Sequence, residues 1–243
     1  MQDLGCSTWC LIDRSLASAL ETLSASTRVV EILSDATHDL LLDSEACASF
    51  DLRYTVHAPT TDINIASCRE PIRQSSLDLV GDTCRVAAGI GATCVVVHPG
   101  FSPWLELLDR SLLALHDSLV DLAAIQEEHG VPVAVENMGS WEVCHFRDPG
   151  LIPLLRECGL SFCLDVGHAH LNGVLEEFLA AARPDHVHLH DNRGTGDDHL
   201  APGCGSIDYA RLLPLLPGDA SWIVEVPGIE AWDESIRFMA GMR

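Results

Sequence analysis

Eight short apolar segments recur along the sequence, and longer amphipathic stretches separate most of them. The segments are rich in Val, Ile and Leu and cover residues 4–10, 28–33, 52–57, 93–98, 131–136, 160–165, 185–190 and 221–226. The intervening stretches, such as 67–89, 105–129 and 174–182, have the Leu, Ala and Glu content typical of helices that bury one face. Apolar strands that alternate with helices form parallel sheets buried on both faces. Eight repeats, with no glycine-rich phosphate-binding turn after the first, favour a closed (β/α)8 TIM barrel over an open doubly wound sheet.

The length and even composition of the chain predict one α/β domain. The 243 residues suit such a barrel, and no linker or change of composition divides residues 1–243. No apolar run approaches the roughly 20 residues that span a membrane, and the start, "MQDLGCSTWC", does not resemble a signal peptide. None of the ten cysteines forms a CxxC pair, and Cys94 and Cys163 lie inside strand-like runs. We therefore expect a cytoplasmic protein with no membrane partner and with reduced, buried cysteines.

The charge of the chain disfavours a nucleic acid partner. The formal net charge is −22, because 36 acidic residues face 14 basic residues, all of them Arg. These arginines are scattered along the sequence, so no basic stripe is expected to attract phosphates. An acidic surface also suits a salt-rich cytoplasm, where even DNA-binding proteins can be acidic. The charge therefore argues against a DNA substrate without excluding it.

Six consecutive predicted strands end in, or closely precede, His, Asp or Glu. In chain order these residues are His57, His98, Glu136, Asp165 with His168 just beyond, His188 with Asp197 and His199 in the following loop, and Glu225. One such residue alone would more often cap a helix or bond to the backbone. In a barrel, however, the carboxyl ends of all strands meet at one mouth, where such enzymes place their chemistry. The pattern therefore predicts a shared metal site.

The residue types narrow the choice of metal. Imidazole nitrogens combined with carboxylate oxygens suit Zn²⁺, Mn²⁺, Fe²⁺ or Co²⁺, whereas oxygen ligands alone would favour Mg²⁺ or Ca²⁺. No cysteine belongs to the set, which argues against a structural thiolate site. His186, His188 and His190 alternate with apolar residues and so face one side of their strand, where one can bind metal while the others support it or contact substrate. In the loop that follows, Ser206 is expected to cap the next helix.

Several motifs together resemble one known family. They are "VHAP" at 56–59, "HPG" at 98–100, "VEN" at 135–137, "LDVGH" at 164–168, "VHLHDN" at 187–192, "DDHLAPGCGSID" at 197–208 and "VEVP" at 224–227. The set resembles the xylose isomerase-like TIM barrels, which include sugar and sugar-phosphate isomerases and epimerases, and also endonuclease IV. The resemblance covers nearly the whole chain.

The sugar isomerases and epimerases of this family imply one divalent ion, held by Glu136, Asp165, His188 and Glu225. The two glutamates would be the catalytic residues, passing a proton through a metal-stabilised enediolate of a small sugar, sugar phosphate or polyol. The resemblance implies that His168 contacts a substrate hydroxyl and that Arg193 contacts one or binds a phosphate. From their positions in the sequence we also expect His190, Asn137 and Trp104 near the substrate. For Arg193 an ion pair with Asp197 or Asp198 is at least as plausible, and for Trp104 packing on the rim is an equal alternative. For Asn137 a role in orienting Glu136 is favoured over contact with the ligand. Members of this group often pair, so a homodimer is a further expectation.

Endonuclease IV implies a longer set of ligands, and every member is present. Three zinc ions would be held by His57, His98 and Glu136, by Glu136, Asp165, His188 and Glu225, and by His168, Asp197 and His199. Short loops, scattered arginines and the wording of the last motifs favour the sugar enzymes instead. We therefore predict a metal-dependent isomerase or epimerase with one to three ions (Zn, Mn, Co or Fe) per chain. The alternative is a trinuclear zinc phosphodiesterase that acts on abasic DNA.

For three residues outside this set, the sequence predicts a position in the interior or on the surface. Glu31, in "VVEIL", resembles the second-strand glutamate of the family, which can line the substrate cavity, although a supporting role in the core is as plausible. His38 and His116 lie in predicted helices away from the strand ends, and we expect them on the surface.

Overall fold

Eight parallel strands close into a barrel in the order in which they occur along the chain. The computed structural model describes residues 3–139 and 141–242. The strands are β1 (Leu4–Ser7), β2 (Val29–Leu33), β3 (Arg53–His57), β4 (Val95–Val97), β5 (Val133–Glu136), β6 (Ser161–Asp165), β7 (His186–Leu189) and β8 (Ser221–Val224). β8 pairs with β1, with Gly5 opposite Ile223, which closes the sheet. The predicted eight-stranded barrel is confirmed.

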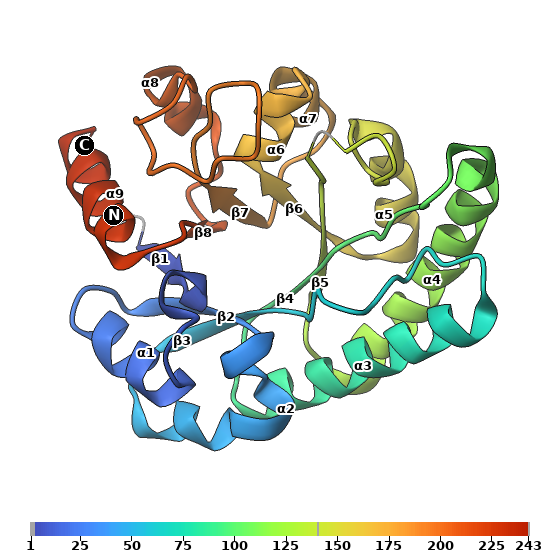
Figure 1. The fold of residues 1–243 in the computed structure, drawn as a ribbon, viewed down its shortest axis with the longest axis horizontal. Helices are drawn as coiled ribbons and strands as arrows, with labels where there is room; N and C mark the ends of the chain where they lie inside the picture. Colours follow the sequence, from blue (N-terminus) through green and yellow to red (C-terminus); the bar gives the residue numbers. More distant parts are fainter. Residues whose placement is uncertain (1–2, 140, 243) are drawn as a thin grey trace.

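The helices surround the strands (Figure 1). They are α1 (Leu16–Ser24), α2 (Leu40–Asp43), α3 (Glu70–Gly89), α4 (Leu108–His129), α5 (Ile152–Cys158), α6 (Val166–Leu171), α7 (Leu175–Ala181), α8 (Tyr209–Leu212) and α9 (Ile229–Gly241). The predicted first strand, 4–10, is too long, because residues Thr8–Leu11 form a 3-10 turn. The Ser7 side chain accepts a hydrogen bond from the backbone of Trp9 and so begins that turn. Among the described residues, no helix is both long and apolar enough to cross a membrane.

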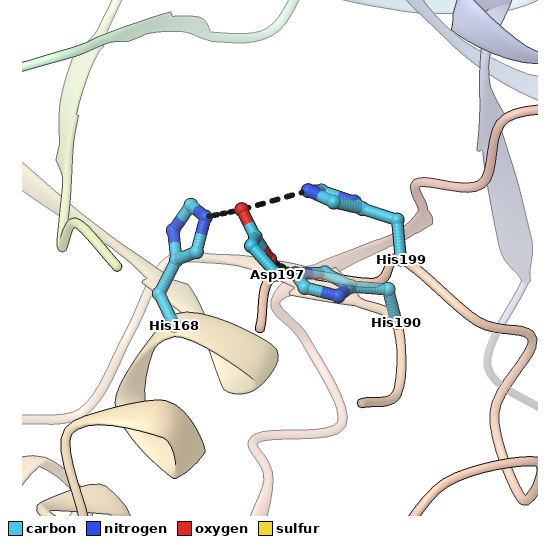
Figure 2. Close-up of side chains that lie close together, drawn as sticks. All are labelled: His168, His190, Asp197 and His199. Carbon is cyan, nitrogen blue, oxygen red and sulfur yellow. Dashed lines mark hydrogen bonds and ion pairs between the residues drawn. The ribbon is translucent and has the colours of Figure 1, made fainter. Parts of the chain in front are cut away.

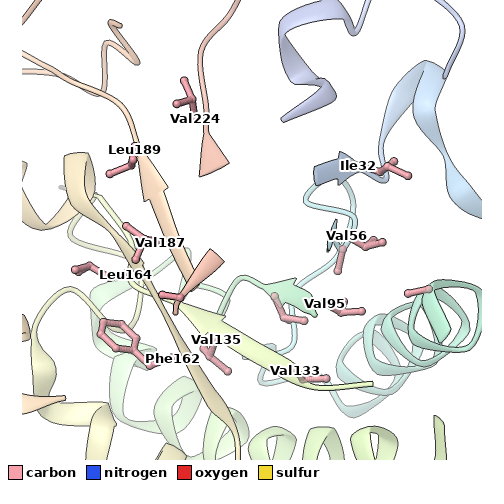
Figure 3. Close-up of a cluster of buried hydrophobic side chains, with 14 of the residues drawn as sticks. Ile32, Val56, Val95, Val133, Val135, Phe162, Leu164, Val187, Leu189 and Val224 are labelled. Atoms are coloured by element: carbon pink, nitrogen blue, oxygen red, sulfur yellow. The ribbon is translucent and has the colours of Figure 1, made fainter. Parts of the chain in front are cut away.

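The period of two along each strand divides the core into two layers. On β4, Val95 and Val97 pack outward against the helices, whereas Val96 points into a small inner cluster with Cys94, Ala134 and Cys163. Figure 3 shows the outward layer, which includes Val95 on β4 and Val187 on β7. All ten cysteines are free, and six of them are buried. Because small apolar residues fill part of the interior, the remaining inward positions toward the mouth are left to polar side chains.

Gly5 provides a test of how tightly the barrel closes. A Cβ atom at Gly5 would lie 2.5 Å from Cδ1 of Ile223 and 2.9 Å from Cγ1 of Val29, on the two neighbouring strands. We expect Gly5→Val to lower the free energy of unfolding by about 1–3 kcal/mol, because overpacking forces neighbours to shift. Urea denaturation measures the change. Gly89→Ala is the control, since a Cβ there meets nothing within 4 Å; equal effects of the two changes would contradict the prediction.

Candidate metal centre

The mouth of the barrel brings the predicted site residues together. β3 ends at His57, β5 at Glu136 and β6 at Asp165, while His98 and Glu225 directly follow β4 and β8. The other members come from β7, from α6 and from the loop after β7: His188, His168, Asp197 and His199. Their nitrogen and oxygen atoms fall into three groups, each compact enough to surround one cation.

The first group consists of His57, His98 and Glu136. The Nε2 atoms of His57 and His98 lie 3.1 and 3.2 Å from the same oxygen, Oε2 of Glu136. Nδ1 of His57 lies 2.8 Å from the backbone carbonyl of Ala58, to which it donates. In a neutral ring this leaves the Nε2 lone pair facing a carboxylate. Two electron-rich atoms at that distance need a proton or a cation between them.

The second group consists of Glu136, Asp165, His188 and Glu225. Nδ1 of His188 lies 3.4 Å from Glu136 Oε1, 3.9 Å from Asp165 Oδ2 and 3.6 Å from Glu225 Oε2. Bonds of about 2.0–2.1 Å to a tetrahedral ion place its ligands roughly 3.3 Å apart. The observed separations are therefore close to those of ligands around one ion. Glu136 belongs to both groups and presents a different oxygen to each.

The third group consists of His168, His190, Asp197 and His199 (Figure 2). Oδ2 of Asp197 lies between two rings, 3.1 Å from Nε2 of His168 and 3.3 Å from Nε2 of His199. The ring of His190 stacks on that of His199 with centroids 3.7 Å apart, and its Nε2 lies 3.0 Å from Asp165 Oδ1. His190, which the sequence placed near the substrate, thus links this group to the second.

Three histidines share one hydrogen-bonding pattern: one belongs to the first group and two belong to the third. Their Nδ1 atoms contact backbone carbonyls: His57 that of Ala58, His168 that of Asn137 at 2.9 Å, and His199 that of Glu225 at 3.2 Å. A carbonyl can only accept, so it selects the tautomer whose Nε2 lone pair points at the carboxylates. Metal-binding histidines are held in this way, with the second ring nitrogen donating to a carbonyl or carboxylate. The residues present therefore fit divalent cations.

Burial shifts the pKa values of the site residues toward the uncharged forms. Contacts between carboxylates and imidazoles shift them the other way, and for the three residues below this second effect is larger. For Glu136, burial acts to raise the pKa, but the neighbouring His188 contributes to holding it well below its usual range. For Asp197, burial acts in the same direction, and the contact with His168 helps to hold the pKa far below normal. For His57, burial acts to lower the pKa, yet the contact with Glu136 raises it to about 9. The mouth thus keeps Glu136 and Asp197 ionised.

A buried network supports the second group from below. Glu31 is fully buried inside the barrel, with Oε1 2.9 Å from Nε2 of His188 and Oε2 2.8 Å from Nε2 of His186. Thr55 donates a further hydrogen bond of 2.9 Å to the same carboxylate. Of the two roles open for Glu31, this position favours support of His188 in the core. Cys163 also lies within this cluster, which the sequence analysis missed; it precedes Asp165 by two residues and so faces inward like it.

The loop that carries Asp197 and His199 is held by one carboxylate that the sequence analysis did not single out. Asp191 accepts hydrogen bonds of 2.8–3.1 Å from four backbone N–H groups, those of Asn192, Gly203, Gly205 and Ile207. Its backbone also exchanges two hydrogen bonds with Leu200. His199, beside Leu200, adopts a φ of 45°, a conformation that costs energy for a residue with a side chain. An aspartate shortly after a strand and before a glycine-rich loop was the available signal.

Two expectations for residues outside the groups are wrong. Ser206 does not cap the next helix, because its Oγ donates to the Asn192 carbonyl, and α8 is capped instead by Asp208, which accepts from the backbone of Arg211. His38 is fully buried rather than on the surface, because the turn after β2 folds inward. His116 is exposed on α4, as predicted.

The remaining predicted substrate contacts differ in their surroundings. Asn137 is buried, and its amide both donates to and accepts from the backbone of Asp165, at 2.9 and 2.8 Å. This engagement favours the orienting role over contact with substrate. Arg193 is 65% exposed and lies 3.9 Å from Asp198, as in the ion-pair alternative. Trp104 is 66% exposed, so packing on the rim does not account for it.

Comparison with known proteins identifies the family. The model of the family described as "Xylose isomerase-like TIM barrel" matches residues 30–242. The chain belongs to this family. The resemblance read from its motifs is thereby confirmed.

Similar proteins carry names that refer to both kinds of enzyme between which the sequence left a choice. A protein of Mycobacterium ulcerans named "Probable endonuclease 4" is 34% identical over 198 residues, which cover 76% of each chain. A structure described as a D-tagatose 3-epimerase-like protein has a TM-score of 0.90 and 26% identity, covering 99% of this chain and 96% of the other. The TTHB071 protein from Thermus thermophilus, soaked with ZnCl2, has a TM-score of 0.78 and 27% identity, with coverages of 99% and 96%. The nitrogen and oxygen donor atoms found here are of the kind that zinc binds.

The raised pKa of His57 predicts how the stability of the metal-free protein depends on pH. A pKa of about 9 in the folded state exceeds the unfolded value of about 6.5, so the stabilisation is complete below pH 6.5 and is lost as the pH rises through 9. The loss amounts to about 3 kcal/mol. We expect His57→Asn to reduce the fall in unfolding free energy between pH 6.5 and 9, measured by urea denaturation with a chelator. His116→Asn should leave that fall unchanged, and an unaltered fall in His57→Asn would contradict the assignment.

Proposed function

We propose that this protein is a multinuclear metal-dependent phosphodiesterase of the endonuclease IV type, acting on nucleic acid. The observation that carries the proposal is the pattern shared by His57, His168 and His199, whose ring tautomers direct Nε2 toward carboxylates in two groups outside the second. A single-ion sugar enzyme needs only the second group. We therefore adopt the phosphodiesterase, the alternative of the sequence analysis, because hydrogen bonds or ion pairs hold histidines in all three groups and not in the second group alone.

Each group would hold one divalent ion, and Glu136 would join the first two. Ions held there would activate water and stabilise the charge on both oxygens of a phosphodiester displacement. The protein's own residues fix the positions of the groups relative to one another. Glu136 sets the spacing of the first and second groups through its two oxygens. Asp191 holds the loop so that Asp197 stays between the rings of His168 and His199.

The objections raised by the sequence weigh less once the site and the relatives are known. The match to the Mycobacterium ulcerans protein covers the same 76% of both chains, so a protein with that name has a similar length. Three divalent ions bring six positive charges to four carboxylates, which makes the loaded mouth about +2 even though the chain is −22. In molar salt the Debye length is about 3 Å, so distant surface charges are screened.

Removal of one ligand from an outer group tests the proposal. We expect two or three ions per chain in protein purified without chelator, and cleavage of a duplex that contains one abasic site. His199→Ala should lose about one ion and lower kcat/KM on the order of 10²-fold or more, because the third ion no longer stabilises developing charge. Plasma mass spectrometry and a cleavage assay measure both, with His116→Ala as the control. About one ion per chain, together with intact DNA, would contradict the proposal.

A second candidate is a metal-dependent epimerase of a small polyhydroxylated substrate. The likeness to the D-tagatose 3-epimerase-like structure, at a TM-score of 0.90, favours it. So does the presence of both glutamates, since Glu136 Oε1 and Glu225 Oε2 lie 3.4 and 3.6 Å from Nδ1 of His188. In that reaction the two carboxylates would remove and return a proton on opposite sides of a carbon beside a carbonyl.

Two variants separate the candidates. If the protein is an epimerase, Glu225→Gln should abolish turnover of a ketohexose, because one carboxylate supplies both a ligand and a proton carrier. His98→Ala should then cost less than about tenfold, since the first group would only support Glu136. Isomer analysis of a sugar panel with Mn²⁺ or Co²⁺ measures both. A severe loss of epimerisation in His98→Ala would show that the first group is needed and would count against a single-ion mechanism.

A further inference from the structure

Two tryptophans stand exposed on neighbouring loops of the mouth. Trp104, in the loop after β4, is 66% exposed, and Trp141, in the loop after β5, is 75% exposed. Phe101 and Leu105 beside Trp104 are 40% and 56% exposed. Indole rings are among the largest apolar side chains, and exposing several apolar groups together marks an interaction surface. The centre described above leaves these residues without a role.

The two loops are joined in a short antiparallel ribbon, and both tryptophans lie at the same end of it. The backbone of Phe101 bridges that of Cys144, Ser102 donates to Val143 at 2.8 Å, and His145 donates to Gly100 at 3.2 Å. From one pair to the next, a step forward along one loop is matched by a step back along the other, as in one continuous antiparallel register. Beyond these pairs the chain turns on both sides, at 104–107 and at 141–144, so each tryptophan begins a turn at this end of the ribbon.

The backbone under each tryptophan is fixed although the side chains are exposed. The carbonyl of Trp104 accepts hydrogen bonds from Ser102 Oγ at 2.7 Å and from the Leu107 backbone at 3.0 Å. The carbonyl of Trp141 accepts from the Cys144 backbone at 2.9 Å. At the foot of the ribbon, the Asn64 side chain bonds both backbone groups of Phe101, at 2.8 and 3.1 Å. The rings are therefore carried by an ordered support, which reduces the entropy lost when a ligand stacks on them.

The ribbon adjoins the metal centre. Phe101 and Cys144 line a small cavity of about 50 Å³ together with His98 of the first group. On the other loop, a Cβ atom at Gly139 would lie 3.1 Å from the ring of His168, and Trp141 follows two residues later. A substrate with its reacting atoms between the groups would thus have its neighbouring parts within reach of the tryptophans.

The charges around the ribbon favour stacking over phosphate contacts. Its tips, residues 103–106 and 141–143, contain Glu106 and Glu142 and no arginine. Elsewhere, six arginines are already paired with acidic side chains, namely Arg53, Arg73, Arg85, Arg183, Arg193 and Arg211. Stacking of a base on an aromatic ring needs no cation and tolerates any base, because every base has a π face.

We propose that Trp104 and Trp141 form a platform on which an unpaired nucleobase of the substrate stacks beside the metal centre. The proposal rests on the phosphodiesterase function proposed above. It gives an acidic protein without lysine a means of holding nucleic acid that salt does not weaken.

Binding to a single-stranded oligonucleotide by the chelator-treated full chain tests the platform without catalysis. The probes are an end-labelled decamer of mixed sequence and a decamer of the same backbone without bases, followed by fluorescence anisotropy. We expect the decamer with bases to bind and Trp104→Ala and Trp141→Ala each to weaken binding about five- to a hundredfold. Trp104→Phe and Trp141→Phe should retain most of the affinity, because a smaller aromatic ring still stacks. Leu113→Ala, 64% exposed on α4, is the matched control.

Salt and cleavage give independent readings. We measure the association constant between 0.1 and 1 M KCl and expect the slope of its logarithm against the logarithm of the salt concentration to be smaller than 1 in magnitude. Contacts to several phosphates would instead contribute a slope of about −0.7 for each phosphate. Equal binding of the decamer without bases, or full affinity in the Trp104→Ala, Trp141→Ala double variant, would overturn the platform. Cleavage by the metal-loaded wild type is measured separately: a protein that binds but never cleaves disproves the phosphodiesterase alone. The labelled decamer is also displaced with a ketohexose and with unlabelled oligonucleotide. If the ketohexose displaces it at the lower concentration, the platform is overturned in favour of a sugar site.

Discussion

The buried carboxylate of Glu136 is the group on which the arrangement of the barrel mouth depends. Only 1% of its surface is exposed, so its charge must be balanced by neighbours rather than by water. Oε2 faces His57 and His98, and Oε1 faces His188, which makes one side chain common to two groups. The imidazoles that balance it are themselves fixed, His57 by the Ala58 carbonyl and His188 by Glu31. A cation in either group would replace a proton within a framework that already exists.

The closed sheet makes this concentration of charge possible. Inward side chains on neighbouring strands stack in layers, and small residues such as Ala134 and Cys163 occupy part of the interior. Above them, residues from six strands meet without any need for long loops. The outward layer packs against the helices and supplies the apolar burial that stabilises the barrel. Stability and chemistry therefore use opposite faces of the same strands.

Charge is distributed in a way that agrees with the two proposals. The chain has a formal net charge of −22, and six of its fourteen arginines are engaged in ion pairs. Under the first proposal, attraction of phosphates would therefore be confined to the mouth and would depend on bound ions. The exposed tryptophans on the ribbon offer contacts that do not depend on charge. Under the two proposals, nucleic acid would be recognised by local cations and by stacking, which differs from the extended basic surface common among nucleic acid-binding proteins.

The sequence by itself determined the barrel and the set of metal-capable residues, because strand periodicity and the position of polar residues at strand ends suffice when all those ends meet at one mouth. It also indicated the family. Only the tertiary structure decided that His190 joins Asp165 and Asp197, that Asp191 holds the loop after β7, that Glu31 supports His188 and that His38 is buried. These outcomes depend on which groups lie within about 3 Å after the loops have folded, and hydrogen bonds and ion pairs at that range are decided by side-chain and backbone geometry that a linear pattern does not encode.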